Sequence, residues 1–396
     1  MSIRLFLALI ILADFIFLLY GISTLSISYK EAVIFYDTNG FLHYLVRLST
    51  SIFGQNDYAL RLPFVLFHLA SIPLFYQISS FFLRRDTDRL LSVVVFILLP
   101  GVVSSALLVN SASVVIFFTL LFIYLFLRKK ENLYSLLLPL LVFIDNSFSI
   151  LYLGLFAYSL YVKNRYLMIL SAMMYLISLY MYGFGVHGKP RGFFLDTFGA
   201  YSLIFSPLIF LYFFYTMYRI LIKGKKSILW FISFTALIYS ILISFRQRIV
   251  IEDYAPFVVI SIPLMLGEFL KSYRTRLPQL RKWHRLFFSL VFGFLIINFL
   301  ATYFNQLFYR YIDNPKKHFA YKYHIAKELS RALKQRGVKE IKTDDEKLKK
   351  RLKFYGITSS DNLKLVENNS FADPKSVTIS YINYPIISYS VTKVNK

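Results

Sequence analysis

The run that decides the fold class is "IRLFLALIILADFIFLLYGI", residues 3–22, in which only Arg4 and Asp14 are charged. An apolar helix of about 20 residues crosses the roughly 30 Å hydrocarbon core of a bilayer. Similar runs recur along most of the chain, and 57% of its 396 residues are hydrophobic. One water-soluble core could not bury so much apolar surface, so the sequence predicts a membrane protein. The runs are unbroken rather than alternating, which predicts helices and not barrel strands.

These runs predict an all-α polytopic domain with about eleven transmembrane helices. The predicted spans are Ile3–Ile22, Leu62–Phe82, Leu90–Leu108, Val114–Leu127, Leu133–Ile144, Phe148–Val162, Tyr166–Tyr182, Phe198–Ile222, Ile228–Phe245, Tyr254–Leu270 and Leu286–Tyr303. The stretch from Leu133 to Val162, with Asp145-Asn146 at its middle, is too long for one crossing and short for two; the basic clusters described next favour two crossings. A signal peptide is the alternative for the first span. No small-x-small cleavage site follows it, so we expect an uncleaved helix.

Basic clusters predict the orientation of these helices. With this set of spans the following clusters all fall on one side of the membrane: Arg84-Arg85, Arg128-Lys129-Lys130, Lys163/Arg165, Lys223/Lys225/Lys226 and Lys271 to Arg285. By the positive-inside rule that side is the cytoplasm, so the amino terminus is cytoplasmic and the first loop and the tail are external. The net charge of +24 therefore follows from membrane topology, and no nucleic-acid partner is expected. The absence of cysteine excludes disulfides and thiolate chemistry.

A change in composition near residue 306 predicts two domains. Residues 1–306 form the transmembrane domain, and residues 307–396 form a small external α/β domain. Helical spacing from Ile325 to Leu333 predicts one helix, and a capping box at Thr343 and Glu346 predicts a second helix ending near Gly356. The segments "VKEIK", "LKLV", "SVTISYI" and "IISYSV" predict strands. The second helix is rich in lysine, which is typical of a solvated face; attraction to anionic lipid head groups is the functional alternative.

The first external loop, residues 23–61, is long, and long ordered loops usually carry function. Its segment "SYKEAVIFYDTNGFLHYL", residues 28–45, contains Glu31 and Asp37. Further on, an apolar stripe from Phe41 to Ile52 lies opposite His43 and Arg47. This pattern predicts an amphipathic helix in the membrane interface that ends at Gly54. It either anchors the loop or contributes His43 and Arg47 to catalysis.

Acids are scarce in the transmembrane domain, so each one is a candidate for function. Asp14 lies within a span and must face a partner or a water-filled cavity, because a carboxylate at bilayer depth is costly. At the external face the acids are Glu31, Asp37, Asp57 and Glu252, and the candidate phosphate-binding cations are Arg61, Lys189, Arg191, Arg246 and Arg248. Such a set suits a reaction in which an acid takes a proton while cations stabilise a leaving phosphate. The residues alone also fit ordinary loop charges at a wet interface.

Motifs of soluble chemistry are missing from the sequence. It has no Gly-rich phosphate loop, and its six histidines are scattered without metal-ligand spacing. A nucleotide-powered enzyme is therefore not expected. A divalent metal ion held by Glu31 and Asp37 stays an open alternative.

The first loop and the spans after it resemble a known superfamily. The segment "FYDTNGFLHYLVRLSTSIFGQNDYALRLPFVL" is similar to bacterial relatives of protein O-mannosyltransferases and lipid A aminoarabinose transferases, in the GT-C glycosyltransferase superfamily. The matching elements are Glu31, Tyr36-Asp37, Phe53-Gly54, Asn56-Asp57 and Arg61-Leu62-Pro63. The segments "LLPGVVSSALLVNSAS", "GKPRGFFLDTFGAYSLIFSPL", "SFRQRIVIEDYAPF" and "IKTDDEKLKKRLKFYGI" extend the resemblance, in order, through the chain.

The resemblance implies a glycosyltransferase of the bacterial inner membrane. Its donor would be a sugar on a polyprenyl phosphate, its acceptor a lipid, glycan or protein of the cell envelope, and transfer would occur externally with inversion. Glu31 would be the base, Asp37 would orient the acceptor or share that role, and the cations named above would bind the donor phosphate. Lys30 stands where the superfamily has a first acid, and Thr38-Asn39 replaces a Pro-Pro pair. Two alternatives therefore stay open: a non-catalytic relative that binds polyprenyl lipid, and a transporter of lipid-linked sugars.

Overall fold

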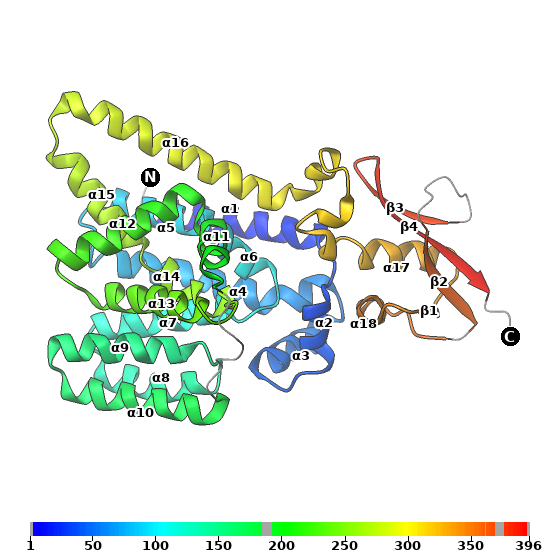
Figure 1. The fold of residues 1–396 in the computed structure, drawn as a ribbon, viewed down its shortest axis with the longest axis horizontal. Coiled ribbons are helices and arrows are strands. Elements are labelled where there is room, and N and C mark those ends of the chain that lie inside the picture. The colour runs from blue at the N-terminus through cyan, green and yellow to red at the C-terminus, as the bar shows by residue number, and fades with distance from the viewer. Residues whose placement is uncertain (1–2, 184–191, 361, 369–375, 394–396) are drawn as a thin grey trace. The chain divides into compact units, whose positions relative to one another are not determined.

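The computed structural model describes residues 3–183, 192–360, 362–368 and 376–393, and most of them are helical (Figure 1). The chain divides into two compact units. Unit 1 comprises Met1–Phe15, Phe64–Ala106 and Asn110–Phe299, and unit 2 comprises Ile16–Pro63, Leu107–Val109 and Leu300–Lys396. The first loop thus groups with the carboxyl-terminal residues, and the domain boundary after residue 306 stays a prediction.

Among the described residues, five helical stretches are long and apolar enough to cross a membrane, or seven if each of two bent helix pairs counts as one span. The long stretches are α1 (Ile3–Thr24), α4 (Asp57–Ser79), α10 (Arg165–Tyr182), α14 (Ala255–Val259) with α15 (Ile262–Thr275), and α16 (Pro278–Tyr303). Four shorter apolar helices are α7 (Ala112–Leu127), α8 (Glu131–Val142), α9 (Phe148–Val162) and α13 (Ile228–Ser244). Membrane-spanning helices are thus predicted correctly as a class, while the count of eleven stays a prediction.

Two predicted spans are not straight, contrary to expectation. The predicted span Leu90–Leu108 consists of α5 (Asp86–Leu98) and α6 (Pro100–Leu107), which are bent by 61°. The predicted span Phe198–Ile222 consists of α11 (Phe194–Phe205) and α12 (Pro207–Lys223), bent by 107°. In both pairs the second helix begins at a proline, which cannot donate a backbone hydrogen bond to the preceding turn. The apolar runs alone did not reveal these breaks.

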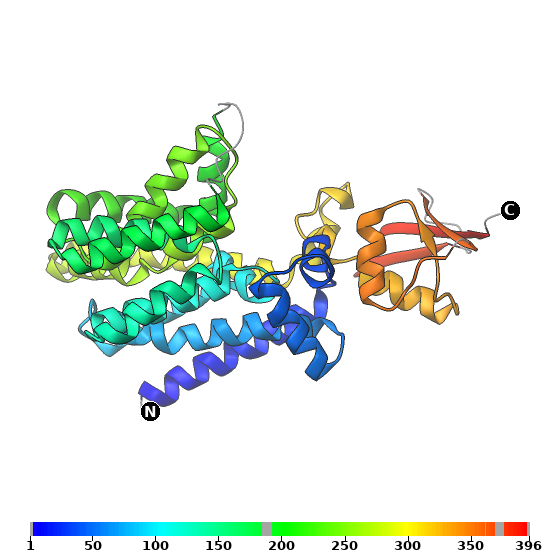
Figure 2. The ribbon, with the colours of Figure 1, turned by 90° about the horizontal axis from the view of Figure 1, so that it is seen from below.

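The doubtful stretch from Leu133 to Val162 contains two helices, as predicted, and they are α8 and α9. Between them the Asp145 carboxylate accepts hydrogen bonds from the backbone N–H and the hydroxyl of Ser147. Helices α8, α9 and α10 lie side by side in Figure 1 and Figure 2. The acid at residue 145 therefore stabilises the turn between two packed helices.

Unit 1 is held together by a continuous apolar core of helix side chains. Helix α9 approaches α13 closely at Gly154, where an added Cβ would lie 2.9 Å from the Cα of Ile232. Small residues permit such close approach between membrane helices. Within this unit Asp14 has a partner, as the cost of a buried carboxylate predicts. It is His68, whose Nε2 lies 2.7 Å from the Asp14 carboxylate. The buried acid of the first span is therefore paired.

Unit 2 contains α2 (Tyr29–Tyr36), α3 (Phe41–Phe53) and a small α/β assembly (Figure 2). Its remaining elements are η2 (Asn305–Arg310), η3 (Pro315–Lys317), η4 (Tyr321–Tyr323), α17 (Ala326–Gln335), α18 (Glu346–Phe354), β1 (Lys342–Thr343), β2 (Leu363–Asn368), β3 (Val377–Tyr381) and β4 (Tyr384–Lys393). Another 3₁₀ turn, η1 (Ile251–Asp253), belongs to unit 1. The sheet has the order β1-β2-β4-β3, with β1 parallel to β2 and the other pairs antiparallel.

The tail folds much as its sequence predicts. In β3, Val377 and Ile379 are buried while Thr378 and Ser380, which alternate with them, are exposed, and α17 and α18 pack on that apolar face. The cap of α18 differs from the prediction, because Asp345 rather than Thr343 accepts the first free N–H. The expected strand "VKEIK" is reduced to the short β1, with one isolated bridge at Glu340.

Candidate functional site

Glu31 lies in the first turn of α2, and its position follows from a local sequence signal. Ser28 and Glu31 form a capping box: the Ser28 hydroxyl accepts from the Glu31 N–H, and the Glu31 carboxylate accepts from the Ser28 N–H at 2.7 Å. This exchange satisfies two backbone donors that the start of a helix leaves unpaired. It also turns the carboxylate inward, where the residue is only 2% exposed.

The buried Glu31 carboxylate is saturated with hydrogen-bond donors. Arg61 donates from Nε to Oε1 at 3.2 Å and from Nη2 to Oε2 at 3.0 Å, and the Val109 N–H donates to Oε1 at 3.1 Å. With the capping bond, each oxygen accepts two hydrogen bonds. Such a carboxylate has no lone pair left for a substrate proton unless one of these bonds breaks.

Arg61 is completely buried, and its guanidinium is likewise occupied by hydrogen bonds within the protein. Besides Glu31, its guanidinium donates to the carbonyl oxygens of Leu25 and Ser26, and Nη1 lies 3.8 Å from the Asp57 carboxylate. A bidentate arginine–carboxylate pair of this kind fixes geometry as well as charge. The structure brings Glu31, Arg61 and Asp57 together, but as partners of one another.

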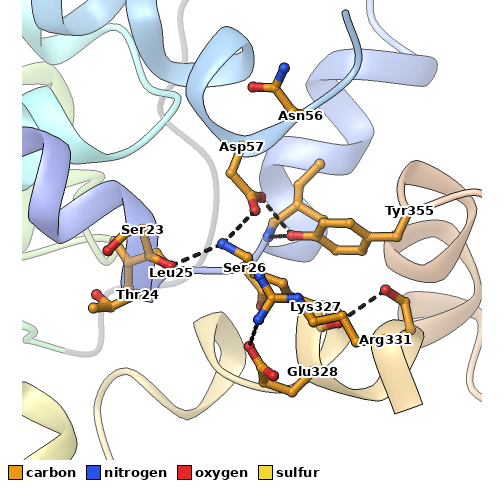
Figure 3. A network of polar contacts seen from close by, with 12 residues as sticks. Ser23, Thr24, Leu25, Ser26, Asn56, Asp57, Lys327, Glu328, Arg331 and Tyr355 are labelled. Carbon is orange, nitrogen blue, oxygen red and sulfur yellow. Dashed lines mark hydrogen bonds and ion pairs between the residues drawn. The ribbon is translucent and has the colours of Figure 1, made fainter. Parts of the chain in front are cut away.

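Asp57, the first residue of α4, collects partners from the carboxyl-terminal part of unit 2 (Figure 3). Lys327 lies 3.0 Å from its carboxylate, and the Tyr355 hydroxyl donates to it at 2.6 Å. The same hydroxyl accepts from the Ile27 N–H, and Lys327 also donates to the Ser23 carbonyl. Burial and the Asp57 carboxylate raise the pKa of Tyr355 well above its ordinary value, so the hydroxyl stays protonated and donates. This network connects the first loop to α17 and α18.

Asp37 differs from the other two acids because it is accessible. It is the carboxyl-terminal cap of α2, and 40% of its side chain is exposed. Its described partner is Lys350 of α18, and this contact raises the pKa of the Lys350 ammonium. An exposed ion pair is easily exchanged for another partner. Of the acids of the first loop described here, Asp37 is therefore the one that a substrate could reach without breaking a buried network.

Helix α3 forms where the sequence predicts it and ends at Gly54, whose φ is +79°. Its His43 donates from Nδ1–H to the Ile34 carbonyl at 2.9 Å, and the Arg47 guanidinium lies 4.3 Å from the centre of the Phe35 ring. Both side chains thus bind α2 and fix the angle between the two helices. Roles for them in catalysis stay predictions.

The remaining candidates lie in unit 1 or outside the described residues. Arg248 forms an exposed ion pair with Asp196 at 3.0 Å, and Arg246 and Glu252 are exposed close by in sequence. Lys189 and Arg191 lie outside the described residues. Within the described part of the chain, no group of three or more His, Asp or Glu residues could hold a metal ion. The groups that donate hydrogen bonds to Glu31 are the Arg61 guanidinium and two backbone N–H groups, and they would repel a metal ion at this carboxylate.

Sequence reasoning named Glu31, Asp57 and Arg61 separately and missed that they form one cluster. The Ser28-x-x-Glu31 pattern was a local signal, because a capping box predicts that the acid binds backbone rather than substrate. No local signal marks Lys327 or Tyr355, which lie 270 and 298 positions after their partner Asp57 in the sequence. Those contacts depend on tertiary structure.

The apolar helices and the small α/β assembly at the carboxyl terminus define the class as a polytopic, mostly helical membrane protein. No protein-family model matches the chain, and no curated protein matches it in sequence. Among solved structures, it is similar to ArnT from Cupriavidus metallidurans, in a crystal structure with bound undecaprenyl phosphate. The TM-score is 0.54 at 9% identity, over 98% of this chain and 97% of that one. The chain has the GT-C fold that its sequence resemblance predicted.

Proposed function

We propose that the protein is a membrane glycosyltransferase that moves a sugar from a polyprenyl-phosphate donor to a cell-envelope acceptor. The observation that carries this proposal is the likeness to ArnT along almost the whole chain, tail included, in a structure that contains undecaprenyl phosphate. Similarity over 98% of the chain covers the transmembrane helices and the tail together, which supports a shared scaffold throughout and not only a match of a few helices. The donor sugar and the acceptor are not specified by this likeness.

The proposed location is the bacterial inner membrane, with about eleven crossings and an external active site. This count requires all four shorter apolar helices and both bent pairs to cross. Helix α3 would lie in the outer interface, because Leu48 and Ile52 are more than half exposed while Val46 and Thr50 are buried. The amino terminus would be cytoplasmic and residues 307–396 external, as the basic clusters predict.

The proposed chemistry is an inverting displacement at the anomeric carbon of the sugar. An acid of the first loop takes the proton of the acceptor nucleophile, the nucleophile bonds to the anomeric carbon, and the polyprenyl phosphate leaves with the bonding electrons. Asp37 suits the role of base better than Glu31, because its carboxylate is accessible and is held by an exposed lysine. Glu31 and Arg61 then hold α2 and α4 in the geometry that the base needs.

Cations would stabilise the charge that develops on the leaving phosphate. Arg246 and Arg248 are the exposed candidates among the described residues, and Lys189 and Arg191 are candidates from the sequence. Arg61 would have to release Glu31 to bind a phosphate, so it is assigned a positioning role here.

The proposal is tested in cells that lack the protein, by complementing them with variants. Lipid extracts are searched by mass spectrometry for an accumulating polyprenyl-phosphate sugar, and the envelope is searched for the missing modification. We expect wild-type protein and Asp313→Asn, an exposed acid outside the network, to remove the accumulated lipid. Asp37→Asn should leave it in place at unchanged protein level. No accumulation in the deletion strain, or full complementation by both Asp37→Asn and Glu31→Gln, contradicts the proposal.

A non-catalytic relative that binds polyprenyl lipid is the second candidate. It is favoured by the saturated hydrogen bonding of Glu31 and by the pairing of Asp37 with Lys350. The purified protein, incubated with a defined polyprenyl-phosphate sugar and envelope extract, separates the two. Sugar transfer without any other protein rules out the non-catalytic role.

A further inference from the structure

Unit 2 contains a hollow that Glu31, Asp37 and Asp57 do not line. Its volume is about 460 Å³, and it lies among the start of α2, the segment before α17, the first turns of α18 and the inner strands β2 and β4 of the sheet. We call it the basic hollow, because its lining includes Lys30, Lys316, Lys322, Lys347 and Arg351. A volume in this range is typical of pockets for small molecules.

The two acids that line the basic hollow do not neutralise it. Glu367 pairs with Lys316 at 2.6 Å, and the Asp345 carboxylate accepts the backbone N–H of Lys347 as the cap of α18. Among the residues that the structure describes, no carboxylate lies within ion-pair distance of Lys30, Lys322, Lys347 or Arg351. Four positive side chains therefore face the hollow against one carboxylate without a described ion-pair partner, that of Asp345, which leaves an excess of positive charge.

Arg351 is the unusual member of this group because it is buried. Only 7% of the residue is exposed, and its described partners are neutral: Nε donates to the Ile27 carbonyl at 2.8 Å and Nη2 to the Ser26 hydroxyl at 3.4 Å. For Nη1, no partner appears in the described part of the chain. Burial lowers the pKa of this guanidinium from its ordinary value. A buried cation without an ion-pair partner is costly. The Asp345 and Glu31 carboxylates offset only part of that cost, and an anion bound in the hollow would offset more of it.

Tyrosine rings supply the rest of the lining. Tyr29, Tyr321 and Tyr389 border the hollow, and the Lys347 ammonium lies 5.9 Å from the centre of the Tyr29 ring. Burial raises the pKa of Tyr321 to about 12, so its hydroxyl is a donor at neutral pH. Aromatic rings beside a cation cluster give a surface for the apolar face of a sugar or a lipid glycerol next to an anionic group.

We propose that the basic hollow is a binding site for a phosphate ester, with Arg351 at its base and Lys30 and Lys322 at its rim. Guanidinium groups bind phosphate oxygens in a fork, and lysines add charge without demanding one geometry. The phosphate ester has two possible sources, a soluble or glycan-linked sugar phosphate and the head group of an anionic lipid. Asp37 and Glu31 do not line the hollow, and binding is measured directly, so the test does not depend on glycosyl transfer.

The first arm of the test uses the purified full-length protein in a neutral detergent and a hexose 1-phosphate as the probe. Titration calorimetry gives the affinity, and thermal unfolding gives the shift of the midpoint. We expect saturable binding in the wild type and at least a tenfold weaker affinity in the double variant Lys30→Gln/Lys322→Gln. Lys349→Gln is the control, because this lysine is on α18, the helix of Arg351, but pairs with Glu346 and does not line the hollow.

The second arm identifies the source of the phosphate ester. The protein is placed in nanodiscs of phosphatidylcholine with or without phosphatidylglycerol, and the unfolding midpoint is compared. A rise with phosphatidylglycerol that disappears in the double variant, without hexose phosphate binding, assigns the site to a lipid head group. Binding of hexose phosphate assigns it to a sugar phosphate. Arg351→Lys should weaken either response more than Lys349→Gln, because lysine keeps the positive charge but loses the fork of the guanidinium.

The proposal is overturned by either of two results. One is that the wild type responds to neither probe. The other is that the double variant and Lys349→Gln respond equally, which would mean that the lysines act only through general surface charge.

Discussion

Replacing Glu31 by glutamine should unfold the first loop before it affects any chemistry. The side chain is 2% exposed and accepts from Arg61 twice, from Ser28 and from Val109. Each Glu31 oxygen accepts two hydrogen bonds, whereas glutamine has an NH₂ group in place of one oxygen. That NH₂ group would face two hydrogen-bond donors and could accept from neither. It also leaves the Arg61 charge buried without its main counter-charge. Breaking a buried pair on one side costs about 3–5 kcal/mol, so we expect Glu31→Gln to lower the unfolding midpoint by several degrees.

The assay is thermal unfolding of the purified protein in detergent, run beside a transfer assay. Asp37→Asn is the comparison, because it removes an exposed acid and should change stability by less than about 0.5 kcal/mol. The double variant Glu31→Gln/Arg61→Gln should lose about 1–3 kcal/mol less than the sum of the two single variants. An inactive Glu31→Gln protein with a wild-type midpoint would refute this reasoning and would identify Glu31 as the base.

Three further predictions address packing, hydrogen bonding and pH. Gly154→Val should lower the unfolding midpoint, since its Cβ would lie 2.9 Å from the Ile232 Cα, whereas serine at the same position should cost less. Tyr355→Phe removes the donor to Asp57 and should cost about 1–3 kcal/mol in chemical or thermal unfolding, without changing Asp37-dependent transfer in the folded protein. Burial lowers the pKa of His324 from 6.5 to about 3. Between pH 6.5 and pH 3 this histidine is therefore protonated in the unfolded chain but not in the folded protein. The free energy of unfolding should fall by up to ~1.4 kcal/mol per pH unit as the pH drops through this range. Unfolding midpoints measured from pH 7 to pH 5 should fall less steeply in His324→Gln than in the wild type.

The helices were predictable because apolar length is a local property of the sequence. The ends of α9 fall where the run from Phe148 to Val162 predicts them. The bends at Pro100 and Pro207 were not predicted, because hydropathy carries no information on the direction of a helix. At each bend the proline lacks the backbone N–H that would continue the preceding helix. Proline within a predicted span was the signal that could have shown them.

The site was predictable as a set of residues and not as an arrangement. Scarcity of acids predicted a functional role for the first loop, and that role stays a prediction. Which acid is buried depends on partners such as Arg61 and Val109, and no spacing in the sequence encodes those contacts. The pairing of Asp14 was predicted from the cost of a charge in lipid, but its partner His68 was not.

The partners of the first loop also set an order for biosynthesis. Residues 23–61 leave the ribosome early, but their hydrogen-bond partners are Val109, then Lys327, then Lys350 to Tyr355 near the end of the chain. Glu31 cannot be satisfied until the third predicted span has been made, nor Asp57 and Asp37 until translation is almost complete. A chain truncated before residue 327 would therefore insert its helices and still carry an unfinished loop.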